Sequence, residues 1–364
     1  MKKQRVTLLT LALSLVVVAS CAGAAGEDGA DGADGADGDA GAPGAPGAPG
    51  APGAPGAPGA PGAPGDPGLA APVDEVPLPS TVFGPESIVA GADGTLFVTS
   101  IGNAAVVKIS PDRSTVTTFI APVVAQPNGK TGMFIDEANG DFWACQISGD
   151  FSVASELRRH DLVTGAVEAT LPLTNNGVCN DIEMDAAGNL YFTDSFFGIQ
   201  RVAPGAAVIE ADWSQNALFT AGVGEFAIDG IVRDGTNLYV NNLTTGDLIK
   251  VPILGNGDAG TPVVIALVDG FGAAATLDSP DGMRLLAANT ILVAESGATN
   301  GLTQVVVDAT ANTGVRSILN NRLDQPSAVV VADGDAWVTE GQIASIFGGA
   351  PVSFPFFVRR VELF

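Results

Sequence analysis

The sequence predicts an all-β protein, a six-bladed β-propeller, preceded by a signal peptide and a collagen-like stalk of Gly-x-y triplets. One hairpin pattern occurs six times with a period in the forties, rich in β-branched and aromatic residues and bounded by Gly or Asp turns. This period is typical of four-stranded propeller blades. Towards the N-terminus, every third residue from Gly26 to Gly68 is glycine. Such a period is typical of collagen.

The clearest copy of the hairpin spans Val178–Ser195. Apolar residues alternate at Ile182 and Met184, a turn follows at Gly188, and the apolar run Leu190–Thr193 leaves it. The outgoing run recurs as Leu96–Thr99, Phe142–Cys145, Leu238–Asn241, Ile291–Ala294 and Ala336–Thr339. Six copies of one hairpin indicate one toroid over residues 74–364.

Residues 1–20 have a basic start and a short apolar stretch, which predicts a secretory signal peptide too short to span a bilayer. They lead into Val18-Ala-Ser-Cys21, which resembles the lipobox of bacterial lipoproteins, so Cys21 is expected to carry the lipid. An ordinary cleaved signal followed by a chance cysteine is the alternative. The residue directly after the cysteine is Ala22 and not Asp, and in this the chain resembles lipoproteins that are sent to the outer membrane. The expected location is the bacterial cell envelope, lipid-anchored at the outer membrane or cell surface.

Residues 21–73 form a spacer of Gly-Ala-Asp and then Gly-Ala-Pro triplets. Only glycine fits the axis of a collagen triple helix, so a homotrimer through the stalk is one reading. A lone extended spacer is the other, because proline restricts φ and nothing apolar is available to bury. In either case the stalk is expected to hold the propeller away from a surface.

The ring of blades is expected to close through the two ends of the propeller. From Ser327 only 38 residues remain, about one strand less than a full repeat. An edge strand within 74–83 is expected to complete the last blade, with Phe356–Leu363 as its inner neighbour. The single histidine, His160, lies in an outer strand and is expected to be exposed and without a catalytic role.

Equivalent positions at the start of each blade's first strand should form a ring around the axis. These positions, spaced by 46, 48, 49, 52 and 46 residues, are Glu86, Gly132, Asn180, Asp229, Asp281 and Ser327. Three carboxylates so close together repel one another unless a cation neutralises them. Oxygen-only ligands favour a hard ion, and Ca²⁺ over Mg²⁺. The expected metal ligands are Glu86, Asn180, Asp229 and Asp281.

A hydrated polar channel with one or two protonated carboxyls is the alternative to a metal site. Gly132 and Ser327 are small, so the ring is expected to be open on that side for a substrate. These small residues could equally fit only the taper of the ring. Cys145 and Cys179 are expected at one face, either bridged in an oxidising compartment or as two buried thiols.

Four short motifs carry a resemblance to a known family. They are Pro85-Glu86-Ser87, Asn180-Asp181-Ile182, Asp229-Gly230-Ile231 and Ser279-Pro-Asp281-Gly-Met283. The chain resembles the gluconolactonase/regucalcin (senescence-marker protein) family of six-bladed propellers, which is related to diisopropyl fluorophosphatase and the paraoxonases. The resemblance implies a divalent metal at the same four ligands. It therefore agrees with the ring obtained from spacing.

The chain departs from that family at several positions. Asp229 stands where the family usually has Asn, and Val178 stands where its sugar-acid lactonases have Arg. One histidine excludes the His pair of the paraoxonases. A sugar lactone is therefore not the expected substrate.

These observations favour a surface-tethered, calcium-dependent hydrolase of a small ester, lactone or phosphoester. Asp281 is expected to act as general base or nucleophile, supported by Asp181. The alternative is a non-catalytic, metal-stabilised propeller that binds a glycan or a protein partner. A net charge of −24 argues against nucleic acid as a partner, so the expected contacts are a small molecule at the axis and a membrane through the lipid anchor.

Overall fold

The computed structural model describes residues 74–363 except 124, 126–127, 149–152, 175 and 222–224. The predicted signal peptide, the predicted lipidation site Cys21 and the collagen-like repeat lie outside the described residues. Within the described part, strands dominate, and the helical elements are η1 (Ala217–Phe219) and α1 (Ile343–Gly348). No helix in this part is long and apolar enough to cross a membrane.

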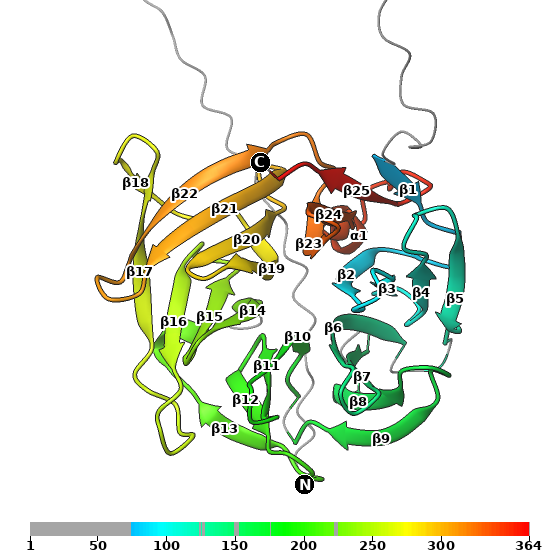
Figure 1. The fold of residues 1–364 in the computed structure, drawn as a ribbon, viewed down its shortest axis with the longest axis horizontal. Coiled ribbons are helices and arrows are strands. Elements are labelled where there is room, and N and C mark those ends of the chain that lie inside the picture. The colour runs from blue at the N-terminus through cyan, green and yellow to red at the C-terminus, as the bar shows by residue number, and fades with distance from the viewer. Residues whose placement is uncertain are drawn as a thin grey trace, which may run out of the picture. The chain divides into compact units, whose positions relative to one another are not determined.

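The described strands form six antiparallel meanders of four strands around a common axis (Figure 1). Meander 1 consists of β2 (Pro85–Ala90), β3 (Leu96–Ser100), β4 (Val106–Ile109) and β5 (Val116–Ile120). Meander 2 consists of β6 (Gly129–Asp136), β7 (Asp141–Ile147), β8 (Glu156–Asp161) and β9 (Val167–Pro172). Meander 3 consists of β10 (Cys179–Met184), β11 (Leu190–Asp194), β12 (Gly198–Val202) and β13 (Glu210–Ser214).

The remaining meanders follow the same order from the axis outwards. Meander 4 consists of β14 (Ile228–Asp234), β15 (Asn237–Asn242), β16 (Leu248–Pro252) and β17 (Val263–Asp269). Meander 5 consists of β19 (Pro280–Ala287), β20 (Thr290–Glu295), β21 (Gly301–Asp308) and β22 (Thr313–Asn320). Meander 6 consists of β23 (Pro326–Ala332), β24 (Asp335–Glu340), β25 (Phe357–Val361) and β1 (Glu75–Pro77). The predicted all-β propeller architecture is confirmed.

Meander 6 joins the two ends of the propeller. The short strand β1 pairs antiparallel with β25, and Val76 lies opposite Val358. Strand β25 in turn pairs with β24, so it lies between β1 and the inner strands. The prediction that the N-terminal strand completes the last blade is confirmed. This pairing covers the outer edge of β25.

One contact between meanders was not expected from the sequence. The outer strands β17 and β22 pair in parallel from Ala266 opposite Thr313 to Asp269 opposite Arg316. Meanders 4 and 5 therefore share one nine-stranded sheet, which also includes β18 (Ala274–Ala275) on β17. β17 and β22, with 7 and 8 residues, are longer than the outer strands of the other meanders, and their free edges meet and satisfy one another's backbone groups.

The apolar core is divided among the interfaces between meanders. Between meanders 1 and 6, for example, Ile88, Val98 and Val107 belong to one buried cluster with Val330 and Val358. Both faces of a blade are covered by its neighbours, so inner strands such as β2 and β3 are buried on both sides, whereas outer strands such as β5 and β22 are largely exposed. The polar residues of the inner strands are left to face the axis.

His160 is buried, contrary to the expectation of an exposed strand residue. Its side chain is 1% exposed, and its ring lies 6.0 Å from that of Phe142 in the interface between meanders 1 and 2. The imidazole Nδ1 donates to the carbonyl of Gly165 over 2.9 Å. Burial lowers the pKa of His160 to about 4, and Lys130 and Arg158 add to this effect. The expectation was wrong because the third strand of meander 2 packs, together with Phe142, against meander 1.

Candidate functional site

The six ring residues lie at irregular starts of the six inner strands. Each inner strand shows a register shift against its neighbour over these first residues, as between Cys179 and Ile182 in β10 or between Ile228 and Ile231 in β14. A bulge redirects a side chain that regular pairing would direct into the sheet face. The shifts therefore direct the ring residues towards the axis.

Side chains at the ends of the second strands satisfy the backbone groups that the bulges leave unpaired. The hydroxyl oxygens of Thr99, Thr193 and Thr339 accept from the backbone N–H of Ser87, Asp181 and Ala328 over 2.9, 2.9 and 3.0 Å. Asn241 accepts likewise from Gly230 over 3.2 Å. This explains why four of the repeated runs end in Thr or Asn. These residues are a sequence signal for the bulges that the spacing of the ring residues did not reveal.

All six ring residues line one small cavity at the axis. Its volume is about 10 Å³, and its lining includes the predicted set Glu86, Gly132, Asn180, Asp229, Asp281 and Ser327. Asp181 also lines it, together with Arg284. A volume of this size holds about one water-sized sphere. The structure thus brings together all the residues predicted for the metal site and for catalysis.

The four predicted ligands are buried and closely coupled. Glu86, Asn180 and Asp229 are each 6% exposed, and Asp281 is 8% exposed. The amide nitrogen of Asn180 donates to Asp229 Oδ2 over 2.7 Å and to Ser195 Oγ over 3.1 Å. Asp281 and Asp229 are hydrogen-bonded through their carboxyls. The side chains of three neighbouring meanders are thereby connected.

Burial is the largest cause of the high carboxyl pKa values at this site. It raises the pKa of Asp229 to about 7, with the carboxylate of Asp181 adding to the effect. The pKa values of Glu86 and Asp281 are raised well above their usual range, first by burial and then by neighbouring carboxylates. Without a counter-charge the cluster therefore holds protons near neutral pH.

Two oxygen atoms of the cluster have no partner in the protein. Glu86 Oε2 and Asp229 Oδ1 are fully buried and accept no hydrogen bond. An unpartnered buried oxygen is costly, and a cation in the small cavity would satisfy both. As these side chains stand, the described residues contain no group of three His, Cys, Asp or Glu arranged to hold a metal ion. The chemistry of the donors, oxygen only, nevertheless fits a hard cation.

Asp181 has a different environment from Asp281. Its two carboxyl oxygens accept from the backbone N–H of Ile182 over 2.9 Å and of Ile231 over 3.2 Å. Burial raises its pKa, and the nearby Arg284 opposes this effect. The hydrogen bond from Ile231 ties β14 to β10. Asp181 is therefore placed to position the neighbouring ligands Asn180 and Asp229.

The opening expected beside Gly132 and Ser327 is closed by packing. A Cβ on Gly132 would lie 2.2 Å from the carbonyl oxygen of Asn180 and 2.4 Å from Cα of Asp181. The hydroxyl of Ser327 donates to the carbonyl of Pro85 over 2.8 Å. Small residues are needed here because the inner strands approach closely. Of the two alternatives for Gly132 and Ser327, the structure therefore favours small residues that fit the taper of the ring over an opening for a substrate.

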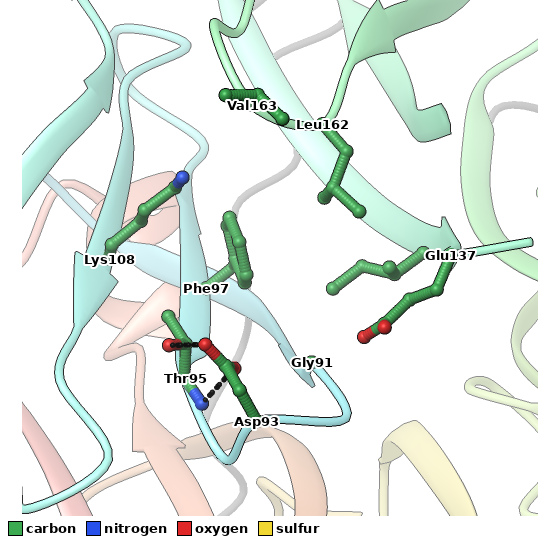
Figure 2. Close-up of a pocket in the computed structure, with 9 residues that line it drawn as sticks. Gly91, Asp93, Thr95, Phe97, Lys108, Glu137, Leu162 and Val163 are labelled. Atoms are coloured by element: carbon green, nitrogen blue, oxygen red, sulfur yellow. Dashed lines mark hydrogen bonds between the residues drawn. The ribbon is translucent and has the colours of Figure 1, made fainter. Parts of the chain in front are cut away.

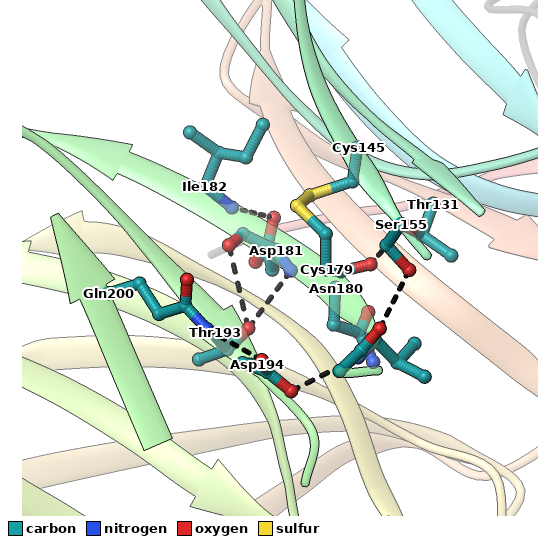
Figure 3. Close-up of a disulfide and its surroundings, with 12 residues drawn as sticks. Thr131, Cys145, Ser155, Cys179, Asn180, Asp181, Ile182, Thr193, Asp194 and Gln200 are labelled. Carbon is teal, nitrogen blue, oxygen red and sulfur yellow. Dashed lines mark hydrogen bonds between the residues drawn. A yellow bond between two sulfur atoms is a disulfide. The ribbon is translucent and has the colours of Figure 1, made fainter. Parts of the chain in front are cut away.

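A disulfide joins Cys145 of β7 to Cys179 of β10, with 5.3 Å between the Cα atoms (Figure 3). Cys179 directly precedes the predicted ligand Asn180, and its carbonyl accepts from Thr131 Oγ1 over 2.8 Å. The bond thus links meanders 2 and 3 beside the candidate site. It restrains the strand start that carries Asn180.

A second cavity lies against the acidic cluster and shares its residues. It has a volume of about 90 Å³ and is lined by Glu86, Asn180, Asp229 and Asp281, with Thr131 and seven apolar side chains. Asp181 is not part of its lining. Asp281 thus faces a space that can hold a small organic group, whereas Asp181 does not.

More spacious clefts lie away from the axis. One of about 340 Å³ lies between meanders 1 and 2 and contains Asp93, Glu137 and Lys108 (Figure 2). Asp93 accepts from the backbone N–H and the hydroxyl of Thr95 over 2.9 and 3.0 Å, and Glu137 accepts from the backbone N–H of Ala92. These carboxylates stabilise turns. The cleft is larger but has no buried acidic cluster, so the axis is the better candidate site.

The fold and site define a class: an all-β propeller with a buried, oxygen-only acidic cluster at its axis. The sequence profile of the SMP-30/Gluconolactonase/LRE-like region matches residues 84–318, more than half of the chain. The chain belongs to this family. Residues 20–74 match the collagen triple helix repeat. A comparison with curated proteins finds no match.

Solved structures show the same fold at low sequence identity. A gluconolactonase from Xanthomonas campestris is 13% identical, with a TM-score of 0.55 over 79% of this chain and 89% of that one. The allergen Mala s 1 of Malassezia sympodialis is 11% identical, with a TM-score of 0.61 over 80% and 97%. Virginiamycin B lyase from Staphylococcus aureus is 14% identical, with a TM-score of 0.50 over 80% and 98%. At these identities the similarity establishes the fold alone.

Proposed function

We propose that the protein is a lipid-anchored, calcium-dependent hydrolase of the bacterial cell envelope that cleaves a small ester, lactone or phosphoester at the propeller axis. The observation that carries the proposal is the buried cluster of Glu86, Asn180, Asp229 and Asp281, which forms one wall of a cavity of about 90 Å³. Membership of a family that includes gluconolactonases supports hydrolysis as the reaction class.

The residues fit a cation through their oxygen atoms. Glu86 Oε2 and Asp229 Oδ1, which lack protein partners, would be ligands together with the side chains of Asp281 and Asn180. Asn180 would present its amide oxygen to the ion. When bound, Ca²⁺ supplies Lewis-acid polarisation of the substrate's carbonyl or phosphoryl oxygen.

Asp281 is the proposed general base or nucleophile. The backbone N–H of Gly282 donates to Asp281 Oδ1 over 3.0 Å, which orients the carboxyl. As a base, the Asp281 carboxylate accepts a proton from water, the water oxygen bonds to the substrate carbon or phosphorus, and the leaving oxygen takes up a proton as its bond breaks. As a nucleophile, the carboxylate itself forms that bond while the leaving oxygen departs and takes up a proton, and water then hydrolyses the covalent intermediate and restores Asp281. Asp181 acts through the backbone that it positions.

The test is an assay of the full chain against lactones, aryl esters and phosphotriesters, with Ca²⁺ and with EDTA. Turnover should need the metal, and Asp281→Asn should lower kcat by about 10²- to 10⁴-fold. Asp181→Asn should give a smaller loss. Asp93→Asn, an exposed aspartate of the distant cleft, is the matched control and should leave kcat unchanged. Metal binding without turnover of any substrate would favour a non-catalytic propeller that binds a glycan or protein.

The location and assembly belong to the same proposal. A lipid on Cys21 would anchor the chain, and the Gly-x-y region lies between this residue and the propeller in the sequence. The collagen repeat match supports a homotrimer through this stalk. The molecular mass of the full chain in solution, measured by light scattering, separates a trimer from a single extended chain.

A further inference from the structure

The larger cavity at the axis is polar on one side and apolar elsewhere. Its polar side consists of the four candidate metal ligands. Its other walls come from the end of β7, from several loops and from α1. The apolar side chains that line them are Ile101, Ile147, Val178, Phe226, Leu243, Ile343 and Phe347.

The apolar walls offer little to a polar or anionic ligand. Among the described residues that line the cavity there is no Lys, Arg or His. The hydroxyl of Thr131 already donates to the carbonyl of Cys179 over 2.8 Å. A carboxylate on the substrate would therefore meet no cationic side chain. The hydroxyl groups of a polyol would be buried without partners, which is unfavourable for each group.

The size of the cavity limits the group that it can hold. Its volume is about 90 Å³. An apolar cavity of about 150 Å³ holds a benzene ring, so this one suits a smaller group, such as a short alkyl chain. Burial of such a chain against the apolar walls is favourable and non-directional.

The wall formed by α1 is held in place by contacts at both ends. A Cβ on Gly84 would lie 2.6 Å from Cδ1 of Ile346, so the helix packs directly on the chain that enters β2. The side chain of Gln342, which precedes α1, accepts from the backbone N–H of Ser353 over 2.7 Å and donates to its carbonyl over 3.1 Å. Phe347 is 50% exposed and borders the cavity from the last turn of this helix.

We infer that the axial site takes a neutral ester or lactone with a short alkyl chain, with its carbonyl at the acidic cluster and its alkyl chain against the apolar walls. This inference rests on the proposed hydrolase function and narrows its substrate class. It excludes sugar-acid lactones, whose hydroxyl groups find no partners on these walls. Phe347 is the specificity residue most accessible to mutation.

The experiment compares two lactones with the same ring size, δ-hexalactone and glucono-δ-lactone, as substrates of the full chain with Ca²⁺. The expected kcat/KM is at least about 100-fold higher for δ-hexalactone than for glucono-δ-lactone. The reason is that glucono-δ-lactone would bury several hydroxyl groups without hydrogen-bond partners. Phe347→Ala should raise KM for δ-hexalactone by about tenfold and leave the value for glucono-δ-lactone unchanged. Phe271→Ala is the control, because Phe271 is 99% exposed and lines neither axial cavity.

A binding measurement separates failure of this inference from failure of the proposed function. Valeramide and gluconamide resist hydrolysis, and calorimetry on the calcium-loaded protein compares their affinities. Metal-dependent turnover with equal or better use of glucono-δ-lactone would overturn the alkyl preference alone. Tighter binding of valeramide, weakened by Phe347→Ala and accompanied by no turnover, would support the apolar site and overturn hydrolysis. Neither turnover nor valeramide binding would overturn both.

Discussion

The side-chain amide of Asn180 donates to Asp229 Oδ2 over 2.7 Å and so joins the inner strands β10 and β14 at the axis. The same aspartate shares a hydrogen bond with Asp281 of β19. Three consecutive meanders thus meet through side chains that can also bind a cation. The effects of metal and pH on stability should therefore be coupled at this point.

Calcium should stabilise the protein more at pH 7.5 than at pH 5. Without metal, burial raises the pKa of Asp229 to about 7 and those of Glu86 and Asp281 well above their usual range. A carboxyl whose folded pKa exceeds its unfolded pKa contributes stability at low pH and loses it as pH rises through the folded value. Bound Ca²⁺ holds the carboxylates ionised, which reverses the sign, and at about 100 times its Kd adds about 2.7 kcal/mol.

Thermal melts of the full chain at both pH values, with EDTA and with millimolar Ca²⁺, measure this coupling. Asp229→Asn is the informative variant, because it removes one repelling charge and keeps an oxygen ligand. Its metal-free form should melt higher than wild type at pH 7.5. If the melting temperature is the same with EDTA and with Ca²⁺ at both pH values, the metal site is ruled out.

Loss of the disulfide should destabilise the propeller and weaken metal binding. Cys145 and Cys179 are 34 residues apart, so the chain-entropy estimate for the closed loop is about 3–4 kcal/mol. The double variant Cys145→Ser/Cys179→Ser should unfold at lower urea concentration with a similar m-value. Its Ca²⁺ affinity should also fall, because Asn180 follows Cys179. An unchanged urea midpoint would contradict a structural role for the bond.

His160 should titrate far below the usual range for histidine. Its folded pKa is about 4, lowered first by burial and then by Lys130 and Arg158. Because this value lies below the unfolded pKa, its contribution is present above about pH 6.5 and is lost as pH falls through 4. The single imidazole allows an unambiguous NMR titration. A midpoint near 6.5 would show that the ring is solvated, and His160→Phe should reduce the loss of stability on acidification.

Cys21→Ser should abolish lipid attachment. Val18-Ala-Ser-Cys21 predicts diacylation of the cysteine, and a serine hydroxyl does not replace its thiol. Labelling with a radioactive fatty acid in a bacterial host measures the modification, and fractionation measures release from the membrane. Cys145→Ser is the matched control and should keep its label. Equal labelling of Cys21→Ser and wild type would show that Cys21 is not the acceptor.

The sequence alone was sufficient for the repeat, the all-β propeller and the family. It also predicted the ring, because equivalent positions of a repeat lie at equal depth, and Glu86, Asn180, Asp229 and Asp281 do line one cavity. The closure of the ring of blades by β1 could be predicted because the last repeat is about one strand shorter than the others. The repeat, the ring and the closure can be read from the periodicity of the sequence, and the family can be read from its short motifs.

Strand register, pairing between outer strands and the burial of individual residues were decided by the tertiary structure, because the periodicity of the sequence does not determine them. The register shifts that direct the ring inwards arise from pairing between strands, and the pairing of β17 with β22 depends on how far the outer strands extend. His160 is buried because a neighbouring blade covers its strand, and Gly132 is required because β10 approaches within contact of it. These properties depend on distances between segments far apart in the chain. Only the packing of neighbouring blades sets those distances.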